Sequence, residues 1–452
     1  MKFNDTIVAQ ATPPGRGGIS IVRVSGPQTT LVAHKILGFL PISRKVNYSC
    51  FYDEKNHIID KGIVLSFPGP NSFTGEDVLE FHCHGSPIIV DILLKIITNI
   101  PQVRLANPGE FTERAFFNQK LDLTQAEAIE DLINAGTKEI ARAAFNSLQG
   151  KFSHLISNLV EQVTDLRVTL ESSIDFANDN IYKITCNEIK NQLNNIIMKI
   201  NEVYNNSFQG TIIQESKRLL IVGKPNVGKS SLFNVFTGKD TAIVTNIAGT
   251  TRDVLQSIIN FEEITLQIID TAGIHKTNNV IEQIGIARAL KLAKIADHII
   301  FMVDNINSDH TQHTIKNFIE EYSKNIPITI VHNKIDLTGE PCALSNFMGQ
   351  TVISISVLTG QGLKLLFNHV KKHLVSYRRT EGQFLARHRH LQSLKKALHY
   401  IQHGQKIFIN THCEELLAEE LRWCHQSLNE ITGEYTTEDL LSKIFSSFCI
   451  GK

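Results

Sequence analysis

The chain has 452 residues, with 45 Lys and Arg against 45 Asp and Glu, and 42% of its residues are hydrophobic. This composition is typical of a globular protein of two or three domains, and its zero net charge means that any contact with RNA must come from a local patch. The seven cysteines form no Cys-x-x-Cys pair, which fits a reducing compartment. We find neither a signal peptide nor an apolar run of membrane-spanning length, and therefore expect a cytoplasmic protein without membrane contact.

Residues 1–118 contain short apolar or alternating segments between Pro/Gly loops, followed by an isoleucine- and leucine-rich segment at 87–100. This pattern predicts several strands and a helix, and hence a compact α+β domain. The loop at 13–18 is either a ligand cradle or a plain loop, and a plain loop is favoured because the strand–GxGxxG–helix order is missing. His82 and His84 share one face of a predicted strand, but no second group of ligands follows at zinc-site spacing, which disfavours a metal site.

The segments on either side of residues 217–375 have helical periodicity, with apolar residues three and four positions apart. The segment 205–210 breaks this pattern and is expected to be a linker. The simplest topology is a helical bundle, formed by 119–210 and 376–452, that is interrupted by the domain at 217–375. The expected helices are 121–149, 155–174, 186–204, 384–401 and 414–431.

A buried strand at 219–222 leads into a Gly-x-x-x-x-Gly-Lys-Ser sequence that starts at Gly223, the pattern of a phosphate-binding loop. Gly223 and Gly228 allow the tight turn that points backbone N–H groups at an anion. Lys229 reaches the β- and γ-phosphates, and the hydroxyl of Ser230 binds Mg²⁺. The following apolar segment predicts a helix whose positive end faces the phosphates. A glycine-rich turn without a ligand is the alternative, and the strand–loop–helix context favours the phosphate loop.

Later segments indicate which nucleotide is bound. A strand ends at Asp270, the Walker-B position that holds Mg²⁺ through water. Another strand ends in an Asn-Lys-x-Asp sequence. The carboxylate of its Asp336 accepts two N–H bonds from guanine, whereas adenine would leave these acceptor oxygens without donors. These motifs resemble the GTP-binding domain of the translation-factor-related GTPases. The residues expected to contact GTP are Asn226, Val227, Gly228, Lys229, Ser230, Ser231, Thr245, Asn246, Ile247, Ala248, Gly249, Thr250, Thr251, Asp270, Thr271, Ala272, Gly273, Asn333, Lys334, Ile335, Asp336, Ser356, Val357 and Leu358.

The group that organises hydrolysis is less clear from the motifs. Small signalling GTPases place a glutamine after Asp-x-x-Gly, but this chain has Ile274 there, which has no hydrogen-bonding group. Asn226 and the oxygen-rich segment 245–250 are suited to bind a monovalent cation, and Glu282 is suited to position water. An ordinary switch loop and a surface glutamate are the alternatives, and the residues alone do not decide between them.

The whole chain resembles the MnmE (TrmE) family of tRNA-modification GTPases. In this family the N-terminal domain is similar to folate-binding aminomethyltransferase folds and mediates homodimerisation. Together with the residue patterns, the expected fold is an N-terminal α+β folate-binding-like domain at 1–118 and a long helical bundle at 119–210 and 376–452, interrupted by a phosphate-loop α/β GTPase domain at 217–375. The segments that carry the resemblance are 5–18, 107–116, 120–128, 247–253 and 449–452.

The resemblance also implies a reaction. Family members hydrolyse GTP and, in a heterotetrameric complex with the flavoprotein MnmG, which uses FAD and NADH, add an aminomethyl or carboxymethylaminomethyl group to C5 of the wobble uridine of certain tRNAs. The one-carbon donor is a 5-formyl- or methylene-tetrahydrofolate. The matching folate positions are Arg23, Glu80, Lys120 and Lys452, the Mg²⁺ positions are Ser230 and Thr251, and the K⁺ positions are Asn226, Thr245, Ile247 and Thr250.

Two further positions gain a role only through the resemblance. Glu282 matches the catalytic glutamate of the family, and Cys449 matches a cysteine that the modification requires. Val357 and Leu358 depart from the usual residues of the last guanine-contacting loop, which leaves main-chain contacts as the ones expected there. A regulatory or ribosome-assembly GTPase without modification chemistry is the alternative, but the basic RNA-binding appendage that it would need is not found.

Overall fold

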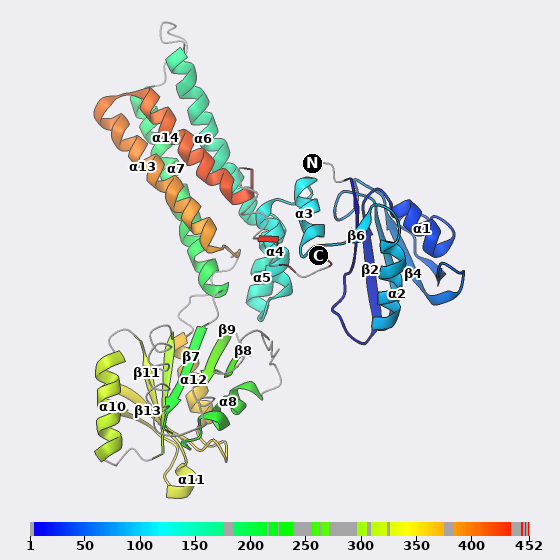
Figure 1. The fold of residues 1–452 in the computed structure, drawn as a ribbon. Coiled ribbons are helices and arrows are strands. Elements are labelled where there is room, and N and C mark those ends of the chain that lie inside the picture. Colours follow the sequence, from blue (N-terminus) through cyan, green and yellow to red (C-terminus); the bar gives the residue numbers. More distant parts are fainter. Residues whose placement is uncertain are drawn as a thin grey trace, which may run out of the picture. The chain divides into compact units, whose positions relative to one another are not determined.

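The computed structural model describes most of the chain in two compact units (Figure 1). The first comprises Met1–Asn134, Ala143–Phe208 and Phe384–Lys452, and the second comprises Ala135–Arg142 and Gln209–Gln383. The mixed α/β and helical fold class predicted from the sequence is confirmed, whereas the narrower domain boundaries stay predictions. The described residues are 4–175, 185–214, 217–224, 226–238, 255–261, 264–270, 296–304, 309–322, 326–374, 384–434, 444–445, 448 and 451.

A six-stranded sheet forms the N-terminal part of the first unit. Its elements are β1 (Thr6–Gln10), β2 (Gly17–Ser25), α1 (Thr29–Leu37), β3 (Asn47–Tyr52), β4 (Ile58–Phe67), β5 (Val78–Gly85), α2 (Pro87–Thr98) and β6 (Val103–Leu105). The strand order is β3-β4-β5-β2-β1-β6, and neighbours are antiparallel except β1 and β6. Alternate residues such as Val22, Val24 and Phe81 pack with α1 and α2 in one apolar core, as the period of two predicts.

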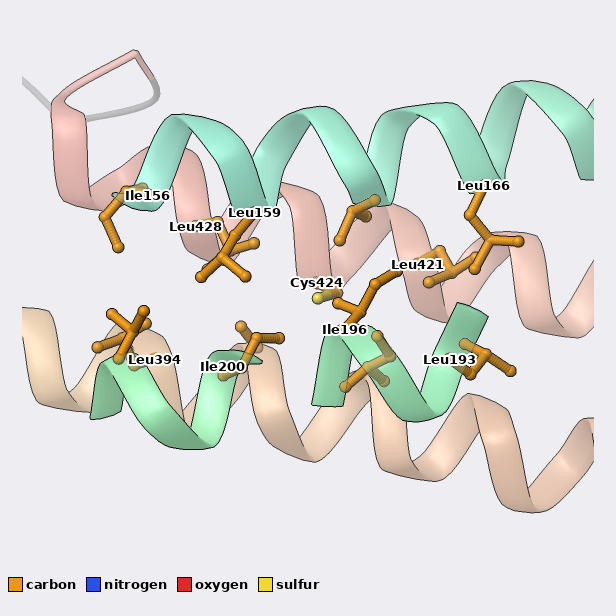
Figure 2. Packing of buried hydrophobic residues seen from close by; sticks show 14 of the residues in the cluster. Ile156, Leu159, Leu166, Leu193, Ile196, Ile200, Leu394, Leu421, Cys424 and Leu428 are labelled. Atoms are coloured by element: carbon orange, nitrogen blue, oxygen red, sulfur yellow. The ribbon is translucent and has the colours of Figure 1, made fainter. Parts of the chain in front are cut away.

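Long helices form the rest of the first unit. They are α3 (Glu110–Phe117), α4 (Leu123–Ile133), α5 (Lys138–Leu148), which the boundary between the units crosses, α6 (Lys151–Asp175), α7 (Cys186–Gln214), α13 (His388–Thr411) and α14 (Glu414–Thr432). Figure 2 shows apolar side chains of α6, α7, α13 and α14 turned toward one another. Helices that precede the second unit in the sequence and helices that follow it therefore share one buried core. The chain leaves the helical bundle after α7 and returns to it before α13.

Three of the predicted helices have wrong limits. The expected helix 384–401 begins at His388 and continues to Thr411. The expected helix 121–149 is divided at residues 134–137, where Asn134 ends α4 and the hydroxyl of Thr137 accepts a bond from the backbone N–H of Ile140. Conversely, α7 continues through the expected linker at 205–210 to Gln214. Ser207 is fully buried one turn after Val203, so packing in the bundle outweighs the low helix propensity of this segment.

The second unit is an α/β domain with a seven-stranded sheet. Its elements are β7 (Lys217–Gly223), α8 (Lys229–Thr237), β8 (Leu255–Phe261), β9 (Ile264–Asp270), β10 (His298–Val303), α10 (Asp309–Tyr322), β11 (Ile328–His332), α11 (Ile335–Thr338), β12 (Leu344–Phe347), β13 (Gln350–Ser354) and α12 (Leu363–Leu374). The order is β12-β13-β11-β10-β7-β9-β8, with antiparallel pairs only at the two edges.

Both faces of this sheet are covered. Apolar residues of α8 and α12 pack in one core, and Ile315 and Ile319 of α10 pack in a second core with other residues of the same strands. Central strands such as β10 are buried along their whole length, which explains their continuous apolar sequences. In such a sheet, ligands bind at the carboxyl ends of the parallel strands. Among the helices in the described ranges, none combines the length and apolar character needed to cross a bilayer.

Candidate functional site

The predicted phosphate loop joins β7 to α8, and two of its glycines have no room for a side chain. Gly223 has φ 155°, and a Cβ there would lie 2.4 Å from the carbonyl oxygen of Met302 in β10. Gly228 has φ 101°, and its Cβ would lie 2.3 Å from Nδ2 of Asn333. A side chain at Gly223 would press on β10, and one at Gly228 would displace the side-chain amide of Asn333, so close packing requires glycine at both ends of the loop.

Lys229 is the first residue of α8 and is only 6% exposed. Its ammonium group donates a 2.7 Å hydrogen bond to the backbone carbonyl of Lys224 within the loop. The buried ammonium group therefore lies inside the loop, next to the positive N-terminal end of α8. The charge of Lys229 and the helix dipole both favour a bound anion. Ser230 is exposed at the next position, so its hydroxyl is accessible to a metal ion. The loop thus fits a phosphate group with Mg²⁺.

The side chain of Asn333 joins three loops of the domain. Its Nδ2 donates to the carbonyl of Val227 at 2.8 Å, and its Oδ1 accepts from the backbone N–H of Val357 at 3.0 Å. Asn333 is 4% exposed, and both bonds are buried. The sequence predicts contact between Asn333 and GTP, and in this structure its side chain ties the phosphate loop to the predicted guanine loop.

The rest of the Asn-Lys-x-Asp sequence lies beside that last loop. Lys334 is left-handed, with φ 70°, and its ammonium lies 3.5 Å from a carboxylate oxygen of Asp304. Asp336 is exposed on the short α11. Ser356 is fully buried and Leu358 is 88% exposed. The loops after β11 and β13 follow adjacent parallel strands, so the structure brings together residues from the phosphate loop and both predicted guanine-contacting segments.

Of the remaining predicted residues, Asp270 lies in the described part of the chain. The backbone of Asp270 at the end of β9 is paired in register with Ile221 of β7, next to the strand that leads into the phosphate loop. The predicted residues outside the described part of the chain are Thr245, Asn246, Ile247, Ala248, Gly249, Thr250, Thr251, Thr271, Ala272, Gly273, Ile274, Glu282, Cys449 and Lys452. Their roles stay predictions.

The predicted folate residues lie in the N-terminal part of the first unit. Arg23 and Glu80 face each other across β2 and β5, and Nε of Arg23 donates to Glu80 at 2.8 Å. The other carboxylate oxygen of Glu80 lies 3.3 Å from Nε2 of His82. Lys120 donates to the carbonyl of Pro70 at 2.9 Å. Arg23 and Glu80 are therefore adjacent and form an ion pair, and a ligand bound there would contact both side chains.

The C-terminal tail reaches the same part of the unit. Gly451 has φ 94°, and a Cβ there would lie 2.1 Å from the carbonyl oxygen of Gln10, at the end of β1. Only glycine allows this approach. The residue before Lys452 thus packs against the N-terminal sheet, although these residues are distant in sequence.

The possible metal residues His82 and His84 have different partners. His82 contacts Glu80, whereas Nδ1 of His84 lies 2.7 Å from a carboxylate oxygen of Asp60. Cys83 faces the core between them, and burial raises the pKa of its thiol to about 11. Within the described ranges, no three His, Cys, Asp or Glu side chains are grouped as metal ligands. The geometry does not support a metal site there.

Sequence reasoning missed a buried charged cluster between α4 and the start of α13. Glu127 accepts two 2.8 Å bonds from Arg389 and lies 3.0 Å from Nε2 of His390. Arg387 contacts Asp131 at 2.9 Å. The available signal was an Arg-His-Arg-His sequence after the interrupting domain, together with acids three and four residues apart on the predicted helix at 121–149. This cluster attaches the chain that leaves the second unit to the helical part of the first.

The protonation states in this cluster follow from geometry and burial. The backbone N–H of Arg387 donates to Nδ1 of His390 at 3.0 Å, so the ring proton is on Nε2, which lies 3.0 Å from a carboxylate oxygen of Glu127. Burial lowers the pKa of His390 to about 4 and keeps the ring neutral. Burial alone would raise the pKa of Glu127, but the interactions with His390 and Arg389 hold it below its usual range. Glu127 is therefore a buried carboxylate.

The second unit, with its phosphate loop between β7 and α8, defines a phosphate-loop nucleotide-binding domain of the GTPase type. Two family signatures match the chain: "GTP-binding protein TrmE N-terminus" at residues 6–120 and "MnmE helical domain" at residues 123–449, a range that includes the second unit. Two relatives named tRNA modification GTPase MnmE, from Yersinia pseudotuberculosis serotype IB (strain PB1/+) and serotype I (strain IP32953), are each 49% identical over 454 residues, covering 100% of both chains. The chain belongs to the MnmE (TrmE) family.

Solved structures give partial matches. The G domain of the T. maritima FeoB iron transporter is 25% identical and matches 35% of this chain and 99% of its own, with a TM-score of 0.28. Aquifex aeolicus Era bound to GDP and AlF4⁻ is 26% identical and matches 41% of this chain and 67% of its own, also with a TM-score of 0.28. Family membership rests on the full-length relatives and on the two family signatures.

Proposed function

We propose that this protein hydrolyses GTP and uses that hydrolysis in modifying C5 of the wobble uridine of certain tRNAs. The observation that carries the proposal is the phosphate loop with its buried Lys229, in a chain 49% identical over its full length to tRNA modification GTPases. Asp336 selects guanine, and Ser230 with Thr251 would hold Mg²⁺, which neutralises phosphate charge during hydrolysis.

The chemistry on uridine needs groups beyond the nucleotide site. We infer a homodimer that assembles with the flavoprotein MnmG, which supplies FAD and NADH, to place an aminomethyl or carboxymethylaminomethyl group on the tRNA. In this proposal Arg23, Glu80, Lys120 and Lys452 bind a one-carbon tetrahydrofolate. The ion pair of Arg23 and Glu80 supports it, since a carboxylate suits pterin N–H donors and a guanidinium suits the folate carboxylates. Cys449 is assigned to the modification reaction.

The modification is tested by mass spectrometry of wobble nucleosides from a bacterial strain that lacks its own family member. We expect the modified wobble uridine to be absent from the strain and to return when this protein is supplied. A variant with Lys364→Ala, which changes an exposed residue of α12, should restore it equally well. If GTP is hydrolysed but the modified nucleoside does not return, the chain is a regulatory or ribosome-assembly GTPase.

Hydrolysis is proposed to depend on a potassium ion held by Asn226, Thr245, Ile247 and Thr250. Asn226 is exposed in the phosphate loop with φ 64°, a conformation that aspartate and asparagine adopt more readily than other side chains. Since Ile274 offers no hydrogen bond to water, the cation supplies positive charge and Glu282 positions the water.

Exchange of the salt tests the cation directly. We expect GTP hydrolysis to be slower in NaCl than in KCl at equal ionic strength by about 10²-fold, the typical effect of one lost electrostatic contact to the transition state. A smaller ion fits the oxygen ligands less well, and Asn226→Ala should remove most of the difference between the salts. Single-turnover rates give the comparison, and equal rates for the unaltered protein in both salts would contradict a potassium site.

A further inference from the structure

The helix α13 has an unusual charge composition for a chain whose net charge is zero. Its 24 residues contain Arg389, Lys395, Lys396 and Lys406 and neither Asp nor Glu. The acids of the bundle lie on neighbouring helices, with Glu414, Glu415, Glu419, Glu420 and Glu430 on α14. α13 is therefore a basic helix in the bundle. In a protein without net charge, RNA binding needs such a local group of positive charges.

Packing decides which side of α13 faces solvent. Leu394, Ala397 and Ile401 are buried in the bundle core, and Figure 2 shows Leu394 turned into it. The helical period then places the polar residues on the opposite side. We call this exposed set the basic face of α13: His388, Lys395, Lys396, His399, His403 and Lys406.

The lysines of the basic face are largely available for a ligand. Neither Lys395 nor Lys406 forms an ion pair with a carboxylate of the described residues. Lys396 is 4.0 Å from Glu430, and His403 lies 2.8 Å from Glu420. At about 1.5 Å per residue, Lys395 and Lys406 are separated by about 16 Å along the helix, enough to meet different phosphate groups of one RNA backbone.

Aromatic rings lie on α13 and on the neighbouring α14. The rings of His399 and His403 are parallel at 7° with centroids 6.2 Å apart, and His399 is 5.9 Å from Tyr400. Tyr400 stacks on Trp423 of α14 at 6.3 Å, and Trp423 is 40% exposed. The guanidinium of Arg422, which Glu419 also binds, is 5.0 Å from the centroid of the Trp423 ring. Surfaces that combine cations with partly exposed aromatic residues are typical of proteins that bind unpaired nucleotides.

We propose that the basic face of α13, with the Tyr400–Trp423 pair beside it, binds the sugar–phosphate backbone of the substrate tRNA and stacks an unpaired base. The inference rests on the proposed function, because tRNA is taken as the ligand. What is added is the surface of this protein that binds the tRNA. Backbone contacts of this kind carry little sequence information, so they suit a protein that serves several tRNAs.

The test compares two double variants of the full-length protein with the same change of charge. One is Lys395→Ala with Lys406→Ala, on the basic face. The control is Lys151→Ala with Lys364→Ala, which removes two exposed lysines from α6 and α12. Binding of a labelled, unmodified tRNA transcript is measured at several salt concentrations, together with GTP hydrolysis and quenching of Trp423 fluorescence.

We expect the basic-face variant to bind tRNA about tenfold more weakly at moderate salt, with a slope of log K against log salt that is smaller by about 1.4 to 1.8. Its GTP hydrolysis and its unfolding midpoint should match the control, which should keep the unaltered affinity and slope. Quenching of Trp423 by tRNA would support stacking.

Other results overturn the proposal in distinguishable ways. Unchanged tRNA affinity and slope in the basic-face variant, with wobble modification intact, would reject this surface and leave the proposed function standing. An unaltered protein that binds no tRNA would overturn the proposed function together with this surface.

Discussion

Replacement of Lys229 by alanine is expected to lower GTP affinity and hydrolysis by about 10²-fold or more, since it removes a charged donor from the phosphates. The effect should be large because Lys229 is 6% exposed and already lies within the loop, where its bond to the carbonyl of Lys224 holds it in position. Equilibrium binding of a fluorescent GTP analogue and single-turnover hydrolysis measure the two losses separately.

Two other variants make this result specific. Lys224→Ala changes the exposed side chain in the same loop but keeps the carbonyl that Lys229 binds, so nearly unaltered binding is expected. Glu282→Ala should keep GTP affinity and lose turnover, by about 10²-fold or more, if this carboxylate positions the water. Unchanged binding and turnover in Lys229→Ala would remove the phosphate role, and unchanged turnover in Glu282→Ala would remove the catalytic one.

Removal of the buried carboxylate of Glu127 is the second change with a large expected effect. Glu127→Ala removes the buried carboxylate that accepts two bonds from Arg389 and lies 3.0 Å from Nε2 of His390. Loss of this buried partner costs about 3–5 kcal/mol of unfolding free energy. Trp423, the single tryptophan, is on α14 in the same unit, so its fluorescence follows the unfolding of that unit in denaturant.

An exposed ion pair in the same unit provides the control. Asp91 and Lys95 lie 2.7 Å apart on α2 with exposed side chains, and Asp91→Ala should change the unfolding free energy by less than about 1 kcal/mol. If Glu127→Ala shifts the transition no more than Asp91→Ala, the buried cluster does not stabilise the unit.

The pH dependence gives a further measure of this cluster. Since the pKa of His390 is about 4 in the folded protein and 6.5 ordinarily, the unfolded chain binds an additional proton between these values. Unfolding free energy should therefore fall as the pH drops below 6.5. Glu127, whose folded pKa is lowered, adds to the loss below its ordinary 4.5. His390→Gln should reduce the loss between pH 6.5 and 4.

The elements that the sequence predicts well are those with local signals. Alternation identified β2, a continuous apolar run identified β11, and glycine spacing identified the turn between β7 and α8. Two of the wrong helix limits have different causes. The division at 134–137 has a local signal in Thr137, whereas the continuation of α7 depends on burial of Ser207 in a bundle that the sequence does not show.

The sequence by itself determined the phosphate loop, the guanine-selecting Asp336 as an expectation, and the family to which the chain belongs, because each depends on residue type and short spacing. Only the tertiary structure decided which residues become partners: Asn333 and Val227 are 106 positions apart, and Arg389 and Glu127 are 262 apart. It also decided that Lys395 and Lys406 of α13 face solvent, because Leu394, Ala397 and Ile401 are buried in the bundle core. Hydrogen bonds and burial depend on distance in space, which chain folding sets and local sequence patterns do not contain.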